Sequence, residues 1–323
     1  MTRVAAIDCG TNSIRLLISD VQPGGKVKDV TRTMEIIRLG KGVDATGEIS
    51  QEALGRARNA LEQFVQQMKF EQVKKVRMVA TSATRDAKNQ QEFFDLTAEL
   101  LGEIEPGACA EVITGEEEAR LSFNGAVSDL APERAPFCVI DLGGGSTEFI
   151  VGDEDGTIDS SHSAQMGCVR ITERIMPSDP PSETEIEIAK DFVADKMEEV
   201  SRLVNVDKAQ TFVGCAGTFT TLSALAQGLE RYDADAIHGT ELRFDALRVL
   251  LDQLMHTPAD ERALNPVIHP GRADVIGGGS VAVEGIMNLI EEHNDARSFV
   301  VSEKDILDGI IAGLVAGMDT SDS

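Results

Sequence analysis

The sequence predicts an α/β protein with two domains. Short apolar runs typical of β-strands alternate with longer segments whose apolar residues recur at the spacing of one helix face. The length of 323 residues exceeds what a single hydrophobic core usually organises. A polar segment with two prolines, 128–136, separates two halves that begin with the same pattern. We therefore predict one domain over residues 1–130 and another over residues 131–302.

Helix and strand signals follow one another closely in the first half. Ser50 is a good N-cap for a helix with one apolar face, and Gly102 is a typical helix stop. Thr114 and Glu117 match a capping box at the start of a further helix. The elements expected in this half are strands over 4–7, 14–18 and 76–80 and helices over 50–68, 93–102 and 114–127.

The second half opens as the first does, with a buried strand that ends in Asp, a glycine-rich turn and a returning strand. Ser182 and Glu185 match a capping box after two prolines, and Ser302 with Asp305 matches another. The elements expected here are strands over 137–140, 148–151, 211–213 and 298–301 and helices over 182–204, 218–228, 244–256, after 270 and over about 303–317. The last of these helices can pack back on the first domain.

Composition excludes several classes of function. The net charge of −25, with one Tyr and no Trp, argues against nucleic-acid binding, which needs a basic face and stacking side chains. No apolar run approaches the roughly 20 residues of a membrane span, so no membrane partner is expected. The N-terminus lacks a signal-peptide pattern, which predicts a cytoplasmic location. Five scattered cysteines and five scattered histidines show no metal or disulfide spacing, and buried thiols are expected.

A tight turn of Gly, Ser, Thr and Asn residues in each half predicts phosphate binding. Consecutive backbone N–H groups in such a turn can point towards phosphate oxygens, and glycine lets the backbone approach the ligand closely. The Asp before each turn repels phosphate unless a hard cation lies between them, and Mg²⁺ suits oxygen ligands best. One such turn fits an ordinary hairpin equally well, but two favour phosphate binding. The turn residues are Gly10, Thr11, Asn12 and Ser13 in the first half and Gly143, Gly144, Gly145, Ser146 and Thr147 in the second.

Segments 8–15 and 141–148 resemble the two phosphate motifs of the exopolyphosphatase/guanosine pentaphosphate phosphatase (Ppx/GppA) family in its short two-domain form. Further segments that resemble this family follow in order at 80–89, 114–121, 214–218, 270–276 and 301–303. The resemblance implies two ribonuclease-H-like domains of the acetate and sugar kinase/Hsp70/actin superfamily with an interdomain cleft. One departure lies in the last helix, where Asp308 stands near the position of an expected basic residue.

The resemblance implies a general base and three phosphate-binding arginines. Glu118 matches the base that activates the attacking water, whereas Glu116 and Glu117 fit an acidic first helical turn that answers the helix dipole. The arginines expected to bind the phosphate chain are Arg15 and Arg85 at the transferring group and Arg272 further along. Phosphoryl transfer depends mainly on such positioning and charge neutralisation.

A metal site is also implied by the resemblance. Asp141 and Glu148 are expected to hold Mg²⁺, with Asp8 assisting through water, and Mn²⁺ can substitute. Glu148, taken alone, also fits a solvent-facing strand residue. A glycine run at 277–282 imitates a dinucleotide-binding fingerprint, but close packing of a helix is the better interpretation.

The function predicted from these features is Mg²⁺-dependent hydrolytic release of terminal orthophosphate from inorganic polyphosphate. Short chains are expected, because the net charge of −25 and the lack of the C-terminal helical domain of longer family members argue against a long cationic channel. The alternatives are a guanosine pentaphosphate (pppGpp) 5′-phosphatase, a sugar or acetate kinase, and a non-catalytic actin- or Hsp70-like nucleotide switch. A homodimer is an open alternative to a monomer.

Overall fold

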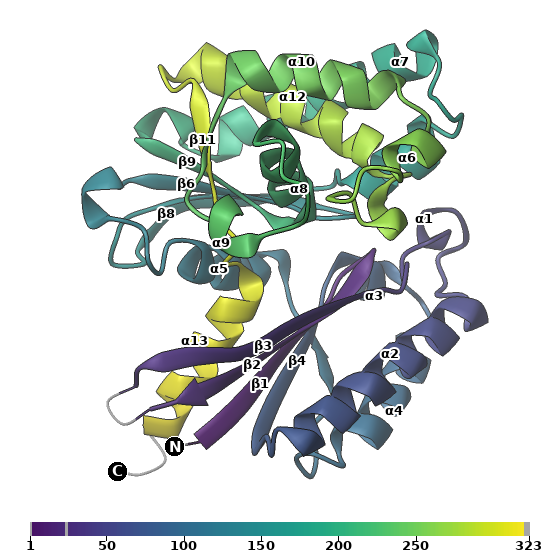
Figure 1. The fold of residues 1–323 in the computed structure, drawn as a ribbon, viewed down its shortest axis with the longest axis vertical. Helices are drawn as coiled ribbons and strands as arrows, with labels where there is room; N and C mark the ends of the chain where they lie inside the picture. The colour runs from purple at the N-terminus through teal and green to yellow at the C-terminus, as the bar shows by residue number, and fades with distance from the viewer. Residues whose placement is uncertain (1, 23–24, 320–323) are drawn as a thin grey trace. The chain divides into compact units, whose positions relative to one another are not determined.

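Two β-sheets with helices packed on them form the computed structural model, which describes residues 2–22 and 25–319 (Figure 1). The α/β class predicted from the sequence is confirmed. The described residues up to Leu121 form one compact unit with those from Ile306 onward, and Ser122–Asp305 form the other. The division falls inside α5 (Gly115–Ala126), upstream of the boundary predicted at residues 130 and 131. A division into two compact units does not show that residues 1–130 and 131–302 fold independently. These domain limits therefore stay predictions.

The first unit contains one five-stranded sheet and the helices around it. Its strands are β1 (Thr2–Cys9), β2 (Ser13–Val21), β3 (Val27–Ile36), β4 (Lys75–Ala80) and β5 (Ala110–Val112). Its helices are α1 (Val43–Thr46), α2 (Gln51–Phe70), α3 (Ser82–Asp86), α4 (Gln90–Leu101), the start of α5, and α13 (Ile306–Asp319).

The first sheet has the order β3-β2-β1-β4-β5, with β1, β2 and β3 antiparallel and β4 and β5 parallel to β1. Alternate residues of β1 face opposite sides of the sheet. Ala5 and Ile7 belong to the core under α2 and α4, whereas Val4 and Ala6 pack with α13. In Figure 1, α13 lies along one face of these strands and α2 and α4 cover the other. Because both faces are covered, β1 is apolar along its whole inner length.

The second unit contains a six-stranded sheet. Its strands are β6 (Phe137–Leu142), β7 (Thr147–Gly152), β8 (Ile158–Ala164), β9 (Thr211–Cys215), β10 (Glu241–Arg243) and β11 (Ser298–Val301). Its helices are the end of α5, α6 (Cys168–Ile175), α7 (Glu183–Leu203), α8 (Ala216–Ala226), α9 (Ala234–Ile237), α10 (Phe244–His256), α11 (Ala259–Arg262) and α12 (Ile276–His293). Three short 3₁₀ turns complete it, η1 (Pro132–Arg134), η2 (Val206–Lys208) and η3 (Pro270–Arg272).

The second sheet repeats the topology of the first. Its order is β10-β11-β9-β6-β7-β8, so the run β8-β7-β6-β9-β11 corresponds to β3-β2-β1-β4-β5. The directions correspond as well, because β7 and β8 are antiparallel to their neighbours and β9 and β11 are parallel to β6. Both units therefore have the ribonuclease-H-like arrangement that was predicted, with β10 added at one edge of the second.

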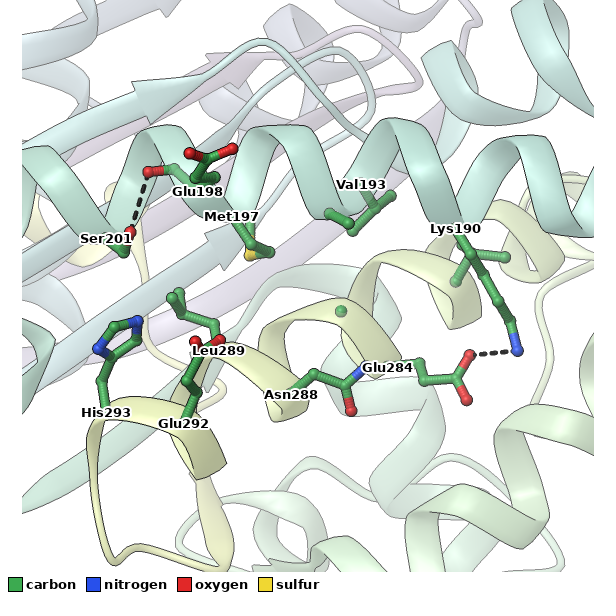
Figure 2. Close-up of a pocket in the computed structure, with 13 residues that line it drawn as sticks. Lys190, Val193, Met197, Glu198, Ser201, Glu284, Asn288, Leu289, Glu292 and His293 are labelled. Atoms are coloured by element: carbon green, nitrogen blue, oxygen red, sulfur yellow. Dashed lines mark hydrogen bonds and ion pairs between the residues drawn. The ribbon is translucent and has the colours of Figure 1, made fainter.

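The glycine run of α12 serves close helix packing. A Cβ at Gly278 would lie 2.5 Å from Thr172 Oγ1 of α6, and one at Gly279 would lie 2.9 Å from Thr218 of α8. A Cβ at Gly285 would lie 2.3 Å from Val193 of α7. The structure thus supports the packing interpretation of residues 277–282 over a dinucleotide fingerprint. Next to this close approach, α7 and α12 border the groove that Figure 2 shows, where Lys190 and Glu284 form an ion pair of 2.8 Å. None of the predicted site residues lines this groove.

Four strands escaped prediction, namely β3, β5, β8 and β10. Three of them, β3, β8 and β10, are edge strands of mixed polar composition. The fourth, β5, has only three residues. An edge strand buries little side-chain surface, so its sequence carries no strong apolar alternation. In the part of the chain that is described, no helix has the length and hydropathy required to cross a membrane.

Candidate functional site

The first predicted phosphate turn joins β1 to β2. Gly10 N–H donates to the Ser13 carbonyl at 3.0 Å and closes the turn. The Thr11 and Asn12 carbonyls accept from N–H groups of the segment 37–40, at 2.8 to 3.0 Å. Across residues 2–22 and 25–319, the N–H groups of Thr11 and Asn12 donate to no other group. The carbonyl side of the turn is therefore occupied, and two amide N–H groups remain for an anion.

The segment 37–40 is part of this turn's support, although sequence reasoning passed over it. Arg38 has φ 48°, a left-handed conformation that is uncommon for residues other than glycine. Gly40 packs so closely that a Cβ there would lie 2.3 Å from Thr11 Cγ2. Thr11 Oγ1 also contacts Ser82 Oγ at 2.9 Å. A glycine two residues after an arginine, in a short segment with the apolar residues Ile37 and Leu39, was the available signal.

Asp8 forms an ion pair with the strand opposite. Asp8 and Arg15 are directly paired in the β1–β2 register, and Arg15 Nη2 lies 2.7 Å from Asp8 Oδ2. The two side chains are only 7% and 17% exposed, respectively. A charge-assisted hydrogen bond with this little exposure is among the stronger polar interactions in proteins. The negative charge of Asp8 is thus matched within its own hairpin.

The second predicted turn joins β6 to β7 with the same closure. Gly143 N–H donates to the Ser146 carbonyl at 3.0 Å. The first N–H groups of α6, which have no partner inside the helix, donate to the carbonyls of Gly143 and Gly144 at 3.0 to 3.1 Å. Within the described ranges, the N–H groups of Gly144 and Gly145 donate to nothing else. This turn also presents two amides, whereas Thr147 Oγ1 donates to the Met166 carbonyl at 2.8 Å and supports the backbone.

Two buried carboxylates face each other behind the second turn. Asp141 and Glu148 are directly paired in the β6–β7 register, and the residues are 7% and 2% exposed. Ser122 Oγ donates to Asp141 Oδ2, and Ser163 Oγ donates to Glu148 Oε1, both at 2.7 Å. The burial of Glu148 rules out the solvent-facing interpretation. Like charges directly opposite on a sheet destabilise it unless a cation or a proton intervenes.

The carboxylate pair fits a hard cation. Mg²⁺ is commonly held by one or two carboxylates together with phosphate oxygens and water. Asp8, the third predicted ligand, belongs to the other unit and accepts hydrogen bonds from Arg15. Over residues 2–22 and 25–319, no group of three His, Cys, Asp or Glu side chains has the arrangement of a complete metal site. The protein by itself thus offers a pair of carboxylates, and the metal stays a prediction.

The three glutamates at the start of α5 have different surroundings. Glu116 is exposed, and Glu117 forms an ion pair with Arg77 at 2.7 Å. Glu118 is 7% exposed, and its Oε2 lies 3.3 Å from Arg85 Nη1. Arg85 is itself positioned by a 2.8 Å hydrogen bond to the Ile113 carbonyl. The structure therefore brings together two of the residues that the sequence predicted separately, although their catalytic roles remain untested.

Arg272 lies in the second unit against the segment 214–218. A Cβ at Gly217 would lie 2.2 Å from Arg272 Cζ, so only glycine leaves room for the guanidinium. Arg272 Nη1 also lies 3.4 Å from the Gly217 carbonyl oxygen. The structure thus joins the two segments, 214–218 and 270–276, that stand far apart in the sequence.

Thiol chemistry at either turn is disfavoured. Burial raises the pKa of Cys168, at the start of α6, to about 11, and burial raises the pKa of Cys9 well above its usual range. A thiol of this kind is almost fully protonated at neutral pH and is a poor nucleophile. The expectation of buried thiols is wrong for Cys109, which is exposed.

Comparisons with known proteins point to one family. The sequence model of the Ppx/GppA phosphatase family matches residues 17–313. Exopolyphosphatase 2 of Mycobacterium tuberculosis is 50% identical over 317 residues, which cover 97% of this chain and 99% of the relative. The crystal structure of an exopolyphosphatase-like protein is 39% identical, with a TM-score of 0.91 over 98% of this chain and 100% of that one. An exopolyphosphatase from Cytophaga hutchinsonii is 26% identical, with a TM-score of 0.87 over 98% of each chain.

Proposed function

Because the chain belongs to the Ppx/GppA phosphatase family, we propose that it is an exopolyphosphatase that releases terminal orthophosphate from inorganic polyphosphate. The observation that carries this proposal is the pair of matching turns. Each one ties its carbonyls to a neighbouring segment and leaves two consecutive amides for phosphate oxygens. A polymer of phosphates supplies several anionic groups to such amides, whereas a single phosphomonoester supplies one.

Glu118 is the proposed general base. It accepts a proton from a water molecule whose oxygen attacks the terminal phosphorus in line with the bridging oxygen. The new P–O bond forms as the P–O bond to the next phosphate breaks, so orthophosphate leaves and the shortened chain keeps the bridging oxygen. The ion pair with Arg85, at 3.3 Å, orients the Glu118 carboxylate. Arg85 is proposed to contact the transferring phosphate as well.

Charge neutralisation is divided between the protein and a cation. Arg15 and Arg272 are proposed to bind phosphate oxygens, and Asp141 with Glu148 to hold Mg²⁺. When bound, the cation neutralises phosphate charge and the charge that develops on the leaving oxygen. Asp8 is proposed to assist through water. The two carboxylates are buried opposite each other, an arrangement that a divalent cation stabilises.

Polyphosphate is favoured over pppGpp because few aromatic side chains are available to stack on a guanine base. Nine of the 12 Phe are fully buried. Among the described aromatic side chains, the large exposed ones are Phe70, 83% exposed at the end of α2, and the single tyrosine, Tyr232. Selecting a nucleotide requires base-specific donors, acceptors and usually a stacking surface. Short chains are proposed because the net charge of −25 disfavours a long polyanion.

The test is a phosphate-release assay over short and long polyphosphate, pppGpp, ATP and ADP. The Glu118→Gln variant, purified in parallel, controls for contaminating phosphatases. We expect the highest kcat/KM with short polyphosphate, and intermediates that accumulate as a ladder on a gel. A higher kcat/KM for pppGpp than for every polyphosphate would overturn the substrate assignment and leave the hydrolase assignment in place. Hydrolysis of none of these compounds would refute the proposed function.

A further inference from the structure

We propose that Ser122 and Ser163 are positioning residues, whose hydroxyl groups hold the carboxylates of Asp141 and Glu148 in the arrangement that binds a divalent cation. This inference rests on the proposed function, since it assigns a cation to that pair. Ser122 and Ser163 matched none of the segments from which site residues were predicted. Neither serine is assigned to contact substrate, so each acts through its carboxylate.

The two hydroxyls reach the pair from different elements. Glu148 is paired with Asp141 on one side and with Ser163 of β8 on the other, so the three side chains form one row across the sheet. Ser122 reaches Asp141 from α5 and is fully buried. Each hydroxyl donates to a different carboxylate at 2.7 Å. An O–H donor at this distance from a carboxylate is a strong, directional contact that restricts side-chain rotation.

The hydroxyl donors oppose the repulsion within the pair. Without a cation, two carboxylates paired across a sheet repel each other, and each side chain lowers its energy by rotating away. A hydrogen bond from Ser122 to Asp141 and one from Ser163 to Glu148 hold both groups near their partner before the cation arrives. Such outer partners of metal ligands typically change metal affinity by about 10- to 100-fold when they are removed.

The first unit provides an internal comparison. The corresponding row across its sheet pairs Asp8 with Arg15, and Arg15 with Met34 of β3. Met34 therefore occupies the position that Ser163 occupies in the second unit. The neighbour of the like-charged pair is thus a hydroxyl donor, Ser163, whereas the neighbour of the Asp8–Arg15 ion pair is a methionine. This difference is expected if the hydroxyl donors serve cation binding, because the ion pair holds Asp8 and Arg15 together without a cation.

The experiment measures Mn²⁺ binding to the full chain by electron paramagnetic resonance, without substrate. Ser122→Ala and Ser163→Ala are each compared with Ser280→Ala. Ser280 is a matched control, because it is fully buried and its hydroxyl donates to the Ile276 carbonyl of its own helix, at 2.9 Å, rather than to a carboxylate. We expect each positioning variant to raise the Kd for Mn²⁺ by about 10-fold, and the double variant by up to about 100-fold. Ser163→Thr, which keeps the hydroxyl, should restore most of the affinity.

A second measurement separates positioning from a general loss of structure. With saturating Mg²⁺, kcat of Ser122→Ala should stay within a few-fold of wild type, while the Mg²⁺ concentration for half-maximal activity rises in step with the Mn²⁺ Kd. Unchanged Mn²⁺ affinity in both alanine variants would overturn the inference, and so would an equal loss in Ser280→Ala. Wild-type protein that hydrolyses polyphosphate without binding Mn²⁺ would refute the inference alone. Serine-dependent Mn²⁺ binding without polyphosphate hydrolysis would refute the proposed function alone.

Discussion

The β1–β2 hairpin and the β6–β7 hairpin are two versions of one design. Each begins with a strand whose second-last residue is Asp and closes its turn with a glycine N–H to serine carbonyl bond of 3.0 Å. Each also leaves two amides that donate to no group within residues 2–22 and 25–319. They differ in the residue opposite the aspartate, which is Arg15 in the first hairpin and Glu148 in the second. The first hairpin thus neutralises its own carboxylate, whereas the second concentrates negative charge. The same backbone therefore carries two electrostatic arrangements, an ion pair of Asp8 with Arg15 in the first hairpin and a pair of like charges, Asp141 and Glu148, in the second.

The supports of the two turns differ as well. In the first unit a loop, 37–40, donates to the turn carbonyls, and in the second unit the start of α6 does so. In both units, the carbonyl oxygens of the turn accept hydrogen bonds from backbone N–H groups. The two turns therefore expose their amides in the same way, although a loop donates to the carbonyls in one unit and a helix start does so in the other.

The largest expected effect concerns the second hairpin, where a cation is proposed to bind. EDTA should abolish polyphosphate hydrolysis, and Mg²⁺ or Mn²⁺ should restore it, because the proposed ligands are oxygens. Asp141→Asn should raise sharply the Mg²⁺ concentration needed for half-maximal activity, because it removes a charged oxygen ligand. Phosphate release in titrations of each metal is the measurement. Full activity in excess chelator would mean that the second hairpin works without a cation.

The next effect concerns a residue outside both hairpins. Glu118→Gln should lower kcat by ~10²–10⁴, since the amide is nearly isosteric but cannot accept the proton. Polyphosphate binding, measured by competition, should persist because both turns are intact. Glu116→Gln is the matched control, because Glu116 lies two residues before Glu118 on α5 and is exposed. Near wild-type turnover of Glu118→Gln together with an inactive Glu116→Gln would place the base elsewhere on the helix.

A smaller effect, on the free energy of unfolding, differs between the two hairpins. In chelator, Asp8→Asn should lower the free energy of unfolding by about 1–3 kcal/mol, because it weakens a charged hydrogen bond with little exposure to solvent. Asp141→Asn should leave that free energy unchanged or raise it, because it removes one of two like charges. Urea unfolding of both variants measures the difference. Equal destabilisation by the two substitutions would show that the hairpins do not differ in this way.

The smallest effect is expected from thiol alkylation, which concerns a feature that the two hairpins share. Each has a buried thiol beside it, Cys9 in the first unit and Cys168 in the second, and burial raises the pKa of both. With a pKa of about 11, the thiolate fraction of Cys168 at pH 7 is on the order of 10⁻⁴. Iodoacetamide at pH 7 should therefore label Cys109, which is exposed, and leave activity unchanged. Mass spectrometry locates the label, and inactivation that follows labelling of Cys168 would contradict the prediction.

Local patterns account for what the sequence determined by itself. The turns around Gly10 and Gly143, the capping box at Ser182 and the apolar strands at 4–7 and 137–140 depend on neighbours a few residues apart. Such short-range preferences depend on consecutive residues, so the α/β class and the presence of the two turns could be predicted. Phosphate binding by these turns stays a prediction. Edge strands such as β3 and β8 could not, because they bury too little surface to impose an alternation.

The tertiary structure alone decided which charges meet. Strand register sets Arg15 against Asp8 and Glu148 against Asp141, and a slip of one residue would turn either side chain to the other face. The contact of Ser122 with Asp141 spans 19 residues, and that of Arg85 with Glu118 spans 33. Contacts of this range follow from how sheets and helices pack, which depends on the whole core rather than on any local pattern. The residue types that could bind phosphate and metal were therefore visible in the sequence, but their partners were not.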